Sequence, residues 1–260
     1  MGVETSLFDL TGRVALLTGA SKGMGLSMAE GLAQHGARVV VSSRKIDQCE
    51  AAVEQINGKC GEGSAIAVAC NVGYKDQLEA LVDETRARLG PIDILVANAG
   101  VNPFYGPMSE IPDSAFDKIM ETNVRSNHWL CRMVAPDMAG NGGGSMMITS
   151  STGAFSASAN LGTYAISKLA DIALVRNLAL EYGPSGVRVN AICPGVVKTD
   201  FARALWDNPE AQRNAQTNVP LRRYGEPDDL KGIAVFLASD ASTYITGQAI
   251  AVCGGTHMWP

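Results

Sequence analysis

Two residues near the start of a predicted helix could do chemistry together. The stretch "LGTYAISKLADIALVRNLALEYG" carries Tyr164 and Lys168 four residues apart, which puts a phenol and an ammonium on one helix face, one turn from each other. A free phenol has a pKa of about 10, too high for a base at neutral pH, and a neighbouring ammonium lowers it by favouring the phenolate. The helix alone leaves a second interpretation open, in which the ring packs on the lysine stem and the charge stays in water.

The elements that must position this pair alternate along the chain. Short apolar runs predict strands at 13–19, 37–44, 64–72, 92–100, 144–151, 187–195 and 248–253. Longer runs between them predict helices at 25–36, 45–57, 75–89, 113–139, 161–182 and 227–239. Strands that are apolar on both faces and separated by helices indicate βαβ units. We therefore expect an α/β fold, with residues 1–260 forming a single Rossmann-like doubly wound domain: a seven-stranded parallel sheet with helices on both faces.

Composition excludes several classes of function. A formal net charge of -5 leaves no basic footprint for nucleic acid, and no apolar run is long enough to span a bilayer, so neither a nucleic-acid nor a membrane partner is expected. The six cysteines and three histidines form no cluster with metal-ligand spacing, which predicts no metal site. We interpret the cysteines as reduced thiols of a cytoplasmic protein.

A glycine-rich loop, "TGASKGMG" at 18–25, follows the first predicted strand and opens the first helix. Gly19, Gly23 and Gly25 leave room for a diphosphate, and the helix start offers free N–H groups and a positive dipole end. Glycine also serves any tight turn, but a strand before and a helix after, close to the N-terminus, favour dinucleotide binding.

The spacing of this loop, TGxxxGxG, together with five further stretches, resembles that of the short-chain dehydrogenase/reductase family. The stretches come in the family's order over essentially the whole chain: "NAG" at 98–100, "KIMETNVRS" around Asn123, "ITSS" at 148–151, "YAISK" at 164–168 and "NAICPGVVKT" at 190–199. The resemblance implies an enzyme that transfers hydride to or from a nicotinamide cofactor.

The resemblance also implies a catalytic group. Tyr164 would be the general acid/base and Lys168 its helper, with donors to spare for the cofactor's ribose. Ser151 would hold and polarise the substrate oxygen; Ser150 is the competing hydroxyl, on the opposite side of the strand by alternation, and the family's spacing to the tyrosine selects Ser151. Asn123 would belong to a water-mediated proton relay ending at Lys168, the alternative being an ordinary hydrogen-bonding residue.

The cofactor-binding residues implied by the resemblance lie in the loops after successive strands. They are Gly19, Ser21, Lys22, Gly23, Met24, Gly25, Ser43, Arg44, Asn71, Val72, Asn98, Ala99, Gly100, Tyr164, Lys168, Pro194, Gly195, Val197 and Thr199. The chain departs from the family at Asn71 and at Cys253, where relatives often carry Asp. An amide still both donates and accepts, and for Cys253 we expect an effect on packing or assembly only.

The preferred cofactor is expected to be NADP(H) rather than NAD(H). An NAD-specific site places a carboxylate at the end of the second strand, where this chain has Ser43 followed by Arg44; the nearest acid, Asp47, is already in the next helix. Arg44 can bind a 2′-phosphate with forked donors, and Lys22 adds a second positive charge. The alternative is a solvated Arg44.

The expected reaction interconverts a carbonyl compound and a secondary alcohol. Apolar residues of the loops after the fourth and fifth strands and of the segment 198–225 predict a mainly apolar, mid-sized substrate: Phe104, Tyr105, Phe155, Phe201, Leu205 and Trp206. Alternatives are a reductase of 3-oxoacyl thioesters on acyl carrier protein, an NAD-dependent secondary alcohol dehydrogenase, and a non-catalytic dinucleotide-binding protein. The last class would be expected to have lost a member of the catalytic group.

Two predictions concern larger features. The polar segment at about 198–225 is expected to be a loop that acts as a lid over substrate and cofactor. A homotetramer is expected because the helices at 113–139 and 161–182 are apolar on more than one face, and because Met258 and Trp259 near the C-terminus could be buried by another subunit.

Overall fold

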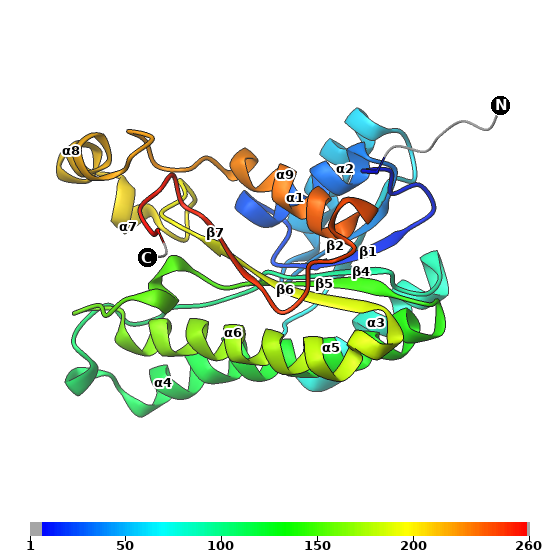
Figure 1. Cartoon of the computed structure of the whole chain (residues 1–260), viewed down its shortest axis with the longest axis horizontal. Helices are drawn as coiled ribbons and strands as arrows, with labels where there is room; N and C mark the ends of the chain where they lie inside the picture. Colours follow the sequence, from blue (N-terminus) through cyan, green and yellow to red (C-terminus); the bar gives the residue numbers. More distant parts are fainter. Residues whose placement is uncertain (1–6, 259–260) are drawn as a thin grey trace.

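Seven strands form one parallel sheet in the computed structural model, which describes residues 7–258 (Figure 1). The strands are β1 (Val14–Thr18), β2 (Arg38–Ser43), β3 (Ala65–Ala69), β4 (Ile94–Ala97), β5 (Gly144–Thr149), β6 (Val187–Pro194) and β7 (Ala249–Val252). Their order in space is β3-β2-β1-β4-β5-β6-β7, and every pair is parallel. The predicted fold class is confirmed.

Helices cover both faces of this sheet (Figure 1). One layer contains α1 (Gly23–Gln34), α2 (Ile46–Cys60) and α9 (Lys231–Ala238); the other contains α3 (Lys75–Leu89), α5 (Ser126–Gly140) and α6 (Gly162–Tyr182). Neighbouring strand residues point to opposite layers: Leu16 joins the apolar core under α3, α5 and α6, and Leu17 joins the core under α1, α2 and α9. This alternation explains why the strands are apolar on both faces.

The carboxyl ends of the strands meet at one edge of the sheet. From β1, the chain adds β2 and then β3 on one side of the sheet, and it then crosses back to add β4 on the other side of β1. Open α/β sheets bind ligands at such a switch point, outside the carboxyl ends of the strands. The loops that follow β1, β4, β5 and β6 therefore form the natural place for a site.

Two predictions about helices need correction. The helix expected at 113–139 consists of α4 (Asp113–Ile119), a π-helical turn (Met120–Arg125) and α5. The segment 198–225 contains two helices, α7 (Arg203–Trp206) and α8 (Pro209–Asn218), instead of a plain loop. The Asn208 side chain caps α8 by accepting from the Ala211 amide at 2.8 Å, and Pro209 occupies its first position, a combination that starts helices.

The apolar residues of α6 lie on more than one face of the helix, as the sequence predicts. Ile172, Val175 and Leu178 are buried. Ile166, Leu169 and Leu180, which share the same sequence periodicity, are exposed at 44%, 51% and 81%. They form an outward apolar face that nothing among the described residues covers.

Candidate active site

The glycine loop packs tightly against the end of β4. Gly19 has a φ of +62°, and a Cβ built on it would lie 2.9 Å from the Ala99 Cα. A Cβ on Gly25 would collide with the carbonyl oxygen of Gly19. The Asn98 side chain fixes this approach by donating to the Gly19 carbonyl at 2.9 Å. Any larger side chain at Gly19 or Gly25 would therefore force the loop open.

The first turn of α1 fits the phosphates of a dinucleotide. Lys22 stands at the N-cap and gives no side-chain cap, and no acidic residue lies in the first turn. The N–H groups and positive dipole end at Gly23, Met24 and Gly25 thus have no side-chain acceptor, which is the arrangement that binds phosphate.

Residues at the ends of β2 and β3 lie along the carboxyl edge of the sheet, on the side of β1 away from β4. Ser43 is partly buried, with its hydroxyl 3.1 Å from the Cys49 sulfur. Arg44 is exposed and forms no ion pair with any residue of the described chain. Asn71 accepts from the Gly73 amide at 3.2 Å, and the side chain of Val72 is buried.

The segment after β6 folds back toward the glycine loop. The Gly195 amide, just after Pro194, donates to the Val252 carbonyl at 3.0 Å. A Cβ on Gly23 would lie 3.2 Å from a methyl group of Thr199. Val197, buried at 4% exposure, pairs with Gly225. These contacts bring both predicted cofactor segments to one place.

Lys22 also joins these two segments, through a contact that the sequence does not reveal. Its ammonium lies 2.9 Å from the Asp200 carboxylate, and both side chains are more than half exposed. Hydrogen bonds from Lys22 and Arg203 lower the pKa of Asp200. The ion pair links the glycine loop to the start of the segment 198–225.

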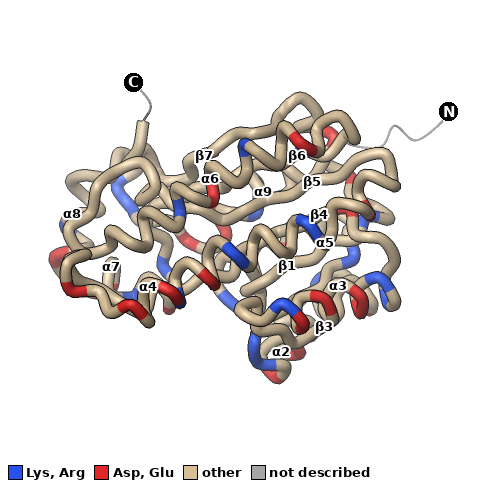
Figure 2. The backbone as a smooth tube through the Cα atoms, turned by 90° about the horizontal axis from the view of Figure 1, so that it is seen from below, with Lys and Arg blue, Asp and Glu red and all other residues tan. Residues whose placement is uncertain are grey.

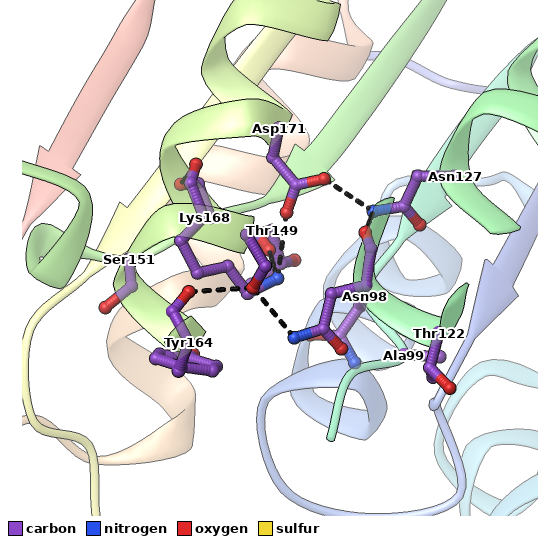
Figure 3. Close-up of polar contacts among 12 residues, drawn as sticks. Asn98, Ala99, Thr122, Asn127, Thr149, Ser151, Tyr164, Lys168 and Asp171 are labelled. Carbon is purple, nitrogen blue, oxygen red and sulfur yellow. Dashed lines mark hydrogen bonds and ion pairs between the residues drawn. The ribbon is translucent and has the colours of Figure 1, made fainter. Parts of the chain in front are cut away.

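Tyr164 and Lys168 meet at the carboxyl edge, beside β5 (Figure 3). The Lys168 Nζ atom lies 5.8 Å from the centre of the Tyr164 ring. Lys168 is 3% exposed, and its ammonium donates to the Thr149 carbonyl at 2.8 Å and to the Asp171 carboxylate at 2.9 Å. The alternative in which the lysine charge stays in water is wrong.

The pKa of Tyr164 is raised above its ordinary value, although the Lys168 ammonium acts to lower it as the sequence predicts. Burial is the largest cause, and the Asp171 carboxylate adds to it; the Lys168 ammonium and a hydrogen bond with Ser151 act in the opposite direction. The ammonium thus limits the effect of burial without reversing it. In the protein without cofactor, the phenol is protonated at neutral pH.

The two serines after β5 have different surroundings. The buried Ser150 hydroxyl donates to the Lys168 main-chain carbonyl at 2.7 Å. The partly exposed Ser151 hydroxyl accepts from the Gly153 amide at 3.0 Å and forms the hydrogen bond that lowers the pKa of Tyr164. Ser151 is therefore the hydroxyl on the side of the phenol.

Asn123 lies in the π-helical turn and is fully buried. Its side chain binds both main-chain atoms of Val101, at 2.8 and 3.0 Å, and donates to the Ser167 hydroxyl at 3.0 Å. Its main-chain carbonyl accepts from the Asn127 side chain at 2.6 Å. The amide thus fixes the segment after Gly100 against α6. π-Helical turns of this kind are common at functional sites.

Sequence reasoning missed Asp171 and Asn127. Asp171 is 0% exposed and binds both Lys168 and the Asn127 side chain. One signal was available: an acidic residue in α6, three positions after Lys168, where the neighbouring Ile172 and Val175 belong to the core. A charge at a core position requires a partner, and an i, i+3 lysine is the nearest one.

The candidate substrate residues are less closely grouped. Phe104 and Tyr164 share a small cavity with Met108 and Leu161. The Phe201 ring lies 6.2 Å from the Tyr164 ring. Tyr105 is exposed, and Leu205 is partly buried.

The other two candidates do not line this cavity and form contacts elsewhere. The indole of Trp206 donates to the Thr199 carbonyl at 2.9 Å, and the Phe155 ring stacks on His257 at 4.4 Å. Near the same tail, the Cys253 sulfur accepts from the His257 amide at 3.4 Å. Cys253 thus caps a turn.

Comparisons with known proteins agree with this geometry. A family model described as enoyl-(acyl carrier protein) reductase matches residues 19–257. Dehydrogenase/reductase SDR family member 4 from Bos taurus is 42% identical over 248 residues, which cover 95% of this chain and 88% of the relative. The member from Caenorhabditis elegans is 37% identical, with 95% of each chain covered.

Solved structures show the same fold with both nicotinamide cofactors. A 7α-hydroxysteroid dehydrogenase in complex with NADH and 7-oxo glycochenodeoxycholic acid is 37% identical, with a TM-score of 0.91 and 98% of each chain covered. A candidate NAD(P)-dependent gluconate 5-dehydrogenase from Beutenbergia cavernae, with NADP at low occupancy, is 34% identical, with a TM-score of 0.90 and 96% and 99% of the two chains covered. The chain is an oxidoreductase of the short-chain dehydrogenase/reductase family.

Proposed function

We propose that the protein interconverts a carbonyl compound and a secondary alcohol with NADP(H). The observation that supports this most strongly is the convergence of Tyr164, Ser151 and Lys168 at the carboxyl edge of the sheet, beside a glycine loop that fits a diphosphate. The bound cofactor would supply or accept the hydride.

Each member of the group has a distinct role in this proposal. Tyr164, protonated at neutral pH, gives its proton to the oxygen of a carbonyl substrate and recovers it in the reverse direction. Ser151 donates a hydrogen bond to that oxygen and polarises the carbonyl. Lys168 has two of its donors on Thr149 and Asp171, which leaves a third for the cofactor's ribose. Asn123 holds the segment after Gly100 in place and belongs to a water-mediated proton relay that ends at Lys168.

The preference for NADP(H) is supported by the charges beyond β2. Arg44 is exposed and forms no ion pair with any described residue, and Ser43 stands where an NAD-specific site has a carboxylate. Lys22 would exchange Asp200 for the 2′-phosphate. That exchange costs little because both side chains of the pair are mostly exposed.

The substrate class is proposed from the rings around Tyr164. The Phe201 ring lies 6.2 Å from the Tyr164 ring, and Phe104 lines the same small cavity as Tyr164, which suits a mainly apolar, mid-sized carbonyl compound. A 3-oxoacyl thioester on acyl carrier protein is the alternative substrate, and NAD(H) the alternative cofactor. A non-catalytic dinucleotide-binding role is disfavoured because Asn123, Ser151, Tyr164 and Lys168 are all present.

We also propose that residues at about 198–225 form the lid within a single domain. Phe201 approaches Tyr164, and Asp200 holds Lys22 of the glycine loop. The segment therefore contacts both halves of the proposed site.

A homotetramer is proposed from the uncovered apolar face of α6, formed by Ile166, Leu169 and Leu180. In Figure 2, charged residues of both signs follow each other along α3, whereas α6 carries few. Met258 is 68% exposed, and Trp259 lies outside the described residues. The molar mass from light scattering tests this assembly.

The cytoplasm is proposed as the compartment from the chemistry of the cysteines. All six are free thiols, as a reducing environment favours. Separately, among residues 7–258 no helix is both long and apolar enough to cross a bilayer.

The reaction is tested with a panel of ketones, secondary alcohols and 3-oxoacyl thioesters, each assayed with NADPH or NADH, or with the oxidised forms for alcohols. Turnover is followed at the nicotinamide absorbance band. The proposal expects apolar ketones with NADPH to give the highest kcat/KM. Activity confined to carrier-bound thioesters would instead favour the alternative.

A further inference from the structure

A buried carboxylate stands directly behind the lysine of the proposed catalytic group. The Asp171 Oδ2 atom lies 2.9 Å from the Lys168 Nζ atom, and the Asp171 Oδ1 atom accepts from the Asn127 side chain at 3.0 Å. The two side chains of the ion pair are 4% and 0% exposed. Figure 3 shows Asp171 and Asn127 on the side of Lys168 away from Ser151.

The donors around Asp171 indicate that it is ionised. The lysine ammonium has only donors, and the Asn127 amide nitrogen divides its two hydrogens between Asp171 and the Asn123 carbonyl. Both carboxyl oxygens therefore accept hydrogen bonds, as a carboxylate does. Burial acts to lower the pKa of Lys168, but the nearby Asp171 charge raises it above its ordinary value.

The other titratable groups that face this pair are neutral over the working range of pH. Tyr164, on α6 itself, has a raised pKa. Burial raises the pKa of Cys193 on β6 to about 11 and that of Cys131 on α5 to about 12. From β5, the pair meets the main-chain carbonyl of Thr149. Asp171 is thus the only counter-charge that the described residues give to Lys168.

We propose that Asp171, held by Asn127, is a positioning residue that keeps the Lys168 ammonium charged and in place for the cofactor. This inference rests on the role given to Lys168 in the proposed function. A buried lysine without a counter-charge loses its proton readily. Without Asp171, Lys168 would lose its charge in the neutral to alkaline range, and its hydrogen bond to the ribose would lose the strength that the charge gives it.

The test uses cofactor binding as a readout that does not depend on turnover. The Kd of NADPH is measured by nicotinamide fluorescence between pH 6 and pH 9.5, values chosen to bracket the titration of an uncompensated buried lysine. The proteins are wild type, Asp171→Asn, Lys168→Met and the double variant. The Asp171→Asn change keeps the size of the side chain and an acceptor oxygen while removing the charge, so the ratio of Kd between this variant and wild type reports the charge.

The proposal expects this ratio to increase about 10-fold or more from the acid to the alkaline end, as one charge-assisted hydrogen bond is lost. In the Lys168→Met background, Asp171→Asn should change nothing further with pH. A Kd ratio that is constant with pH, whatever its size, would overturn the proposal, because a packing defect alone behaves in that way. An increase of the ratio with pH that persists in the Lys168→Met background would also overturn it.

A folding control covers the case in which Asp171→Asn is unstable. Removing one partner of a buried ion pair leaves an unpaired charge, whereas removing both is often nearly neutral. The double variant should therefore have a higher Tm than Asp171→Asn, and an equal or lower Tm would overturn the proposal. The proposed function is tested separately, because its failure would appear as undiminished turnover in Tyr164→Phe. The binding and melting experiments on Asp171 do not measure turnover.

Discussion

The Ser150 hydroxyl donates a 2.7 Å hydrogen bond to the main-chain carbonyl of Lys168, and so fastens the end of β5 to the first turns of α6. Its neighbour Ser151 has different surroundings, since its hydroxyl accepts from the Gly153 amide at 3.0 Å and acts to lower the pKa of Tyr164. Adjacent hydroxyls thus have separate tasks: one joins the two elements that carry the site, and the other faces the reacting oxygen. The pair offers a matched test of the account.

Ser151→Ala should lower kcat by about 100-fold, as the loss of one polarising donor does elsewhere, with little change in Tm. Ser150→Ala should instead lower the free energy of unfolding by about 1 kcal/mol, through one lost buried hydrogen bond, and leave kcat within a few-fold of wild type. Steady-state kinetics and denaturant unfolding of both variants measure this. The reverse ranking in kcat would show that the roles of the two serines are exchanged.

Arg44→Asp should shift the cofactor preference toward NADH. The change removes a guanidinium that can bind the 2′-phosphate and adds repulsion against it. At about 1.5–3 kcal/mol per charged hydrogen bond, the ratio of kcat/KM for NADPH to that for NADH should fall by about 100-fold. Arg132→Asp, an equal change of charge at an exposed position on α5, is the control and should leave the ratio unchanged. A wild type that works better with NADH would contradict the assignment outright.

The segment 198–225 should become protected when the cofactor binds. Hydrogen exchange of peptides from α7 and α8 should slow when NADPH is added, while peptides from α3 stay unchanged. Asp200→Asn, which removes the ion pair with Lys22, should speed exchange in this segment before the cofactor is added. Equal exchange of α7 and α8 with and without NADPH would argue against a lid.

Glu30→Gln should destabilise the fold without touching the site. The Glu30 side chain is 4% exposed and binds Lys59 at 2.7 Å and Lys231 at 2.9 Å, joining α1 to α2 and α9. We expect a loss of about 2 kcal/mol in the free energy of unfolding at neutral pH, the value of a charged hydrogen bond. Glu79→Gln breaks the exposed pair with Lys75 and is the matched control, with an expected loss of about 0.5 kcal/mol or less.

The pH dependence of this loss has a definite sign. Burial acts to raise the pKa of Glu30, but the hydrogen bonds from Lys59, Lys231 and Gln55 outweigh it and lower the pKa below 4.5. The carboxylate therefore contributes stability above the unfolded-state pKa, and this contribution is lost as the pH falls through the lower, folded-state value. Urea unfolding of wild type and Glu30→Gln between pH 3 and pH 7 should show the difference shrinking toward the acid end; a constant difference would contradict the ion-pair account.

The sequence predicted those parts of the molecule that depend on local pattern. Strands such as β1 are apolar on both faces because two helical layers cover them, and glycines such as Gly19 and Gly25 are required by close backbone approaches. The family resemblance placed Tyr164, Lys168 and Ser151, which the fold then brought together. The helix α8 was also within reach of sequence reasoning, since an Asn-Pro pair such as Asn208-Pro209 starts helices as well as loops.

The features that were missed depend on contacts between distant segments. The periodicity of α6 cannot tell the buried Ile172 from the exposed Leu169, because both are apolar and only packing separates them. The π-helical turn around Asn123 arises from hydrogen bonds to Val101 and Ser167. The sign of the pKa shift at Tyr164 follows from burial, which outweighs the charge one turn away.

The Tyr164→Phe variant tests the central claim most directly, because it removes one oxygen and leaves the ring. The measurement is kcat on the best substrate of the panel beside the Kd of NADPH. The account predicts that kcat falls by at least about 100-fold, which is the contribution of a positioned acid/base. The Kd of NADPH should change by no more than about threefold, because the variant loses an interaction that matters only in the transition state. A kcat equal to that of wild type would contradict the assignment of Tyr164 as the proton donor and acceptor.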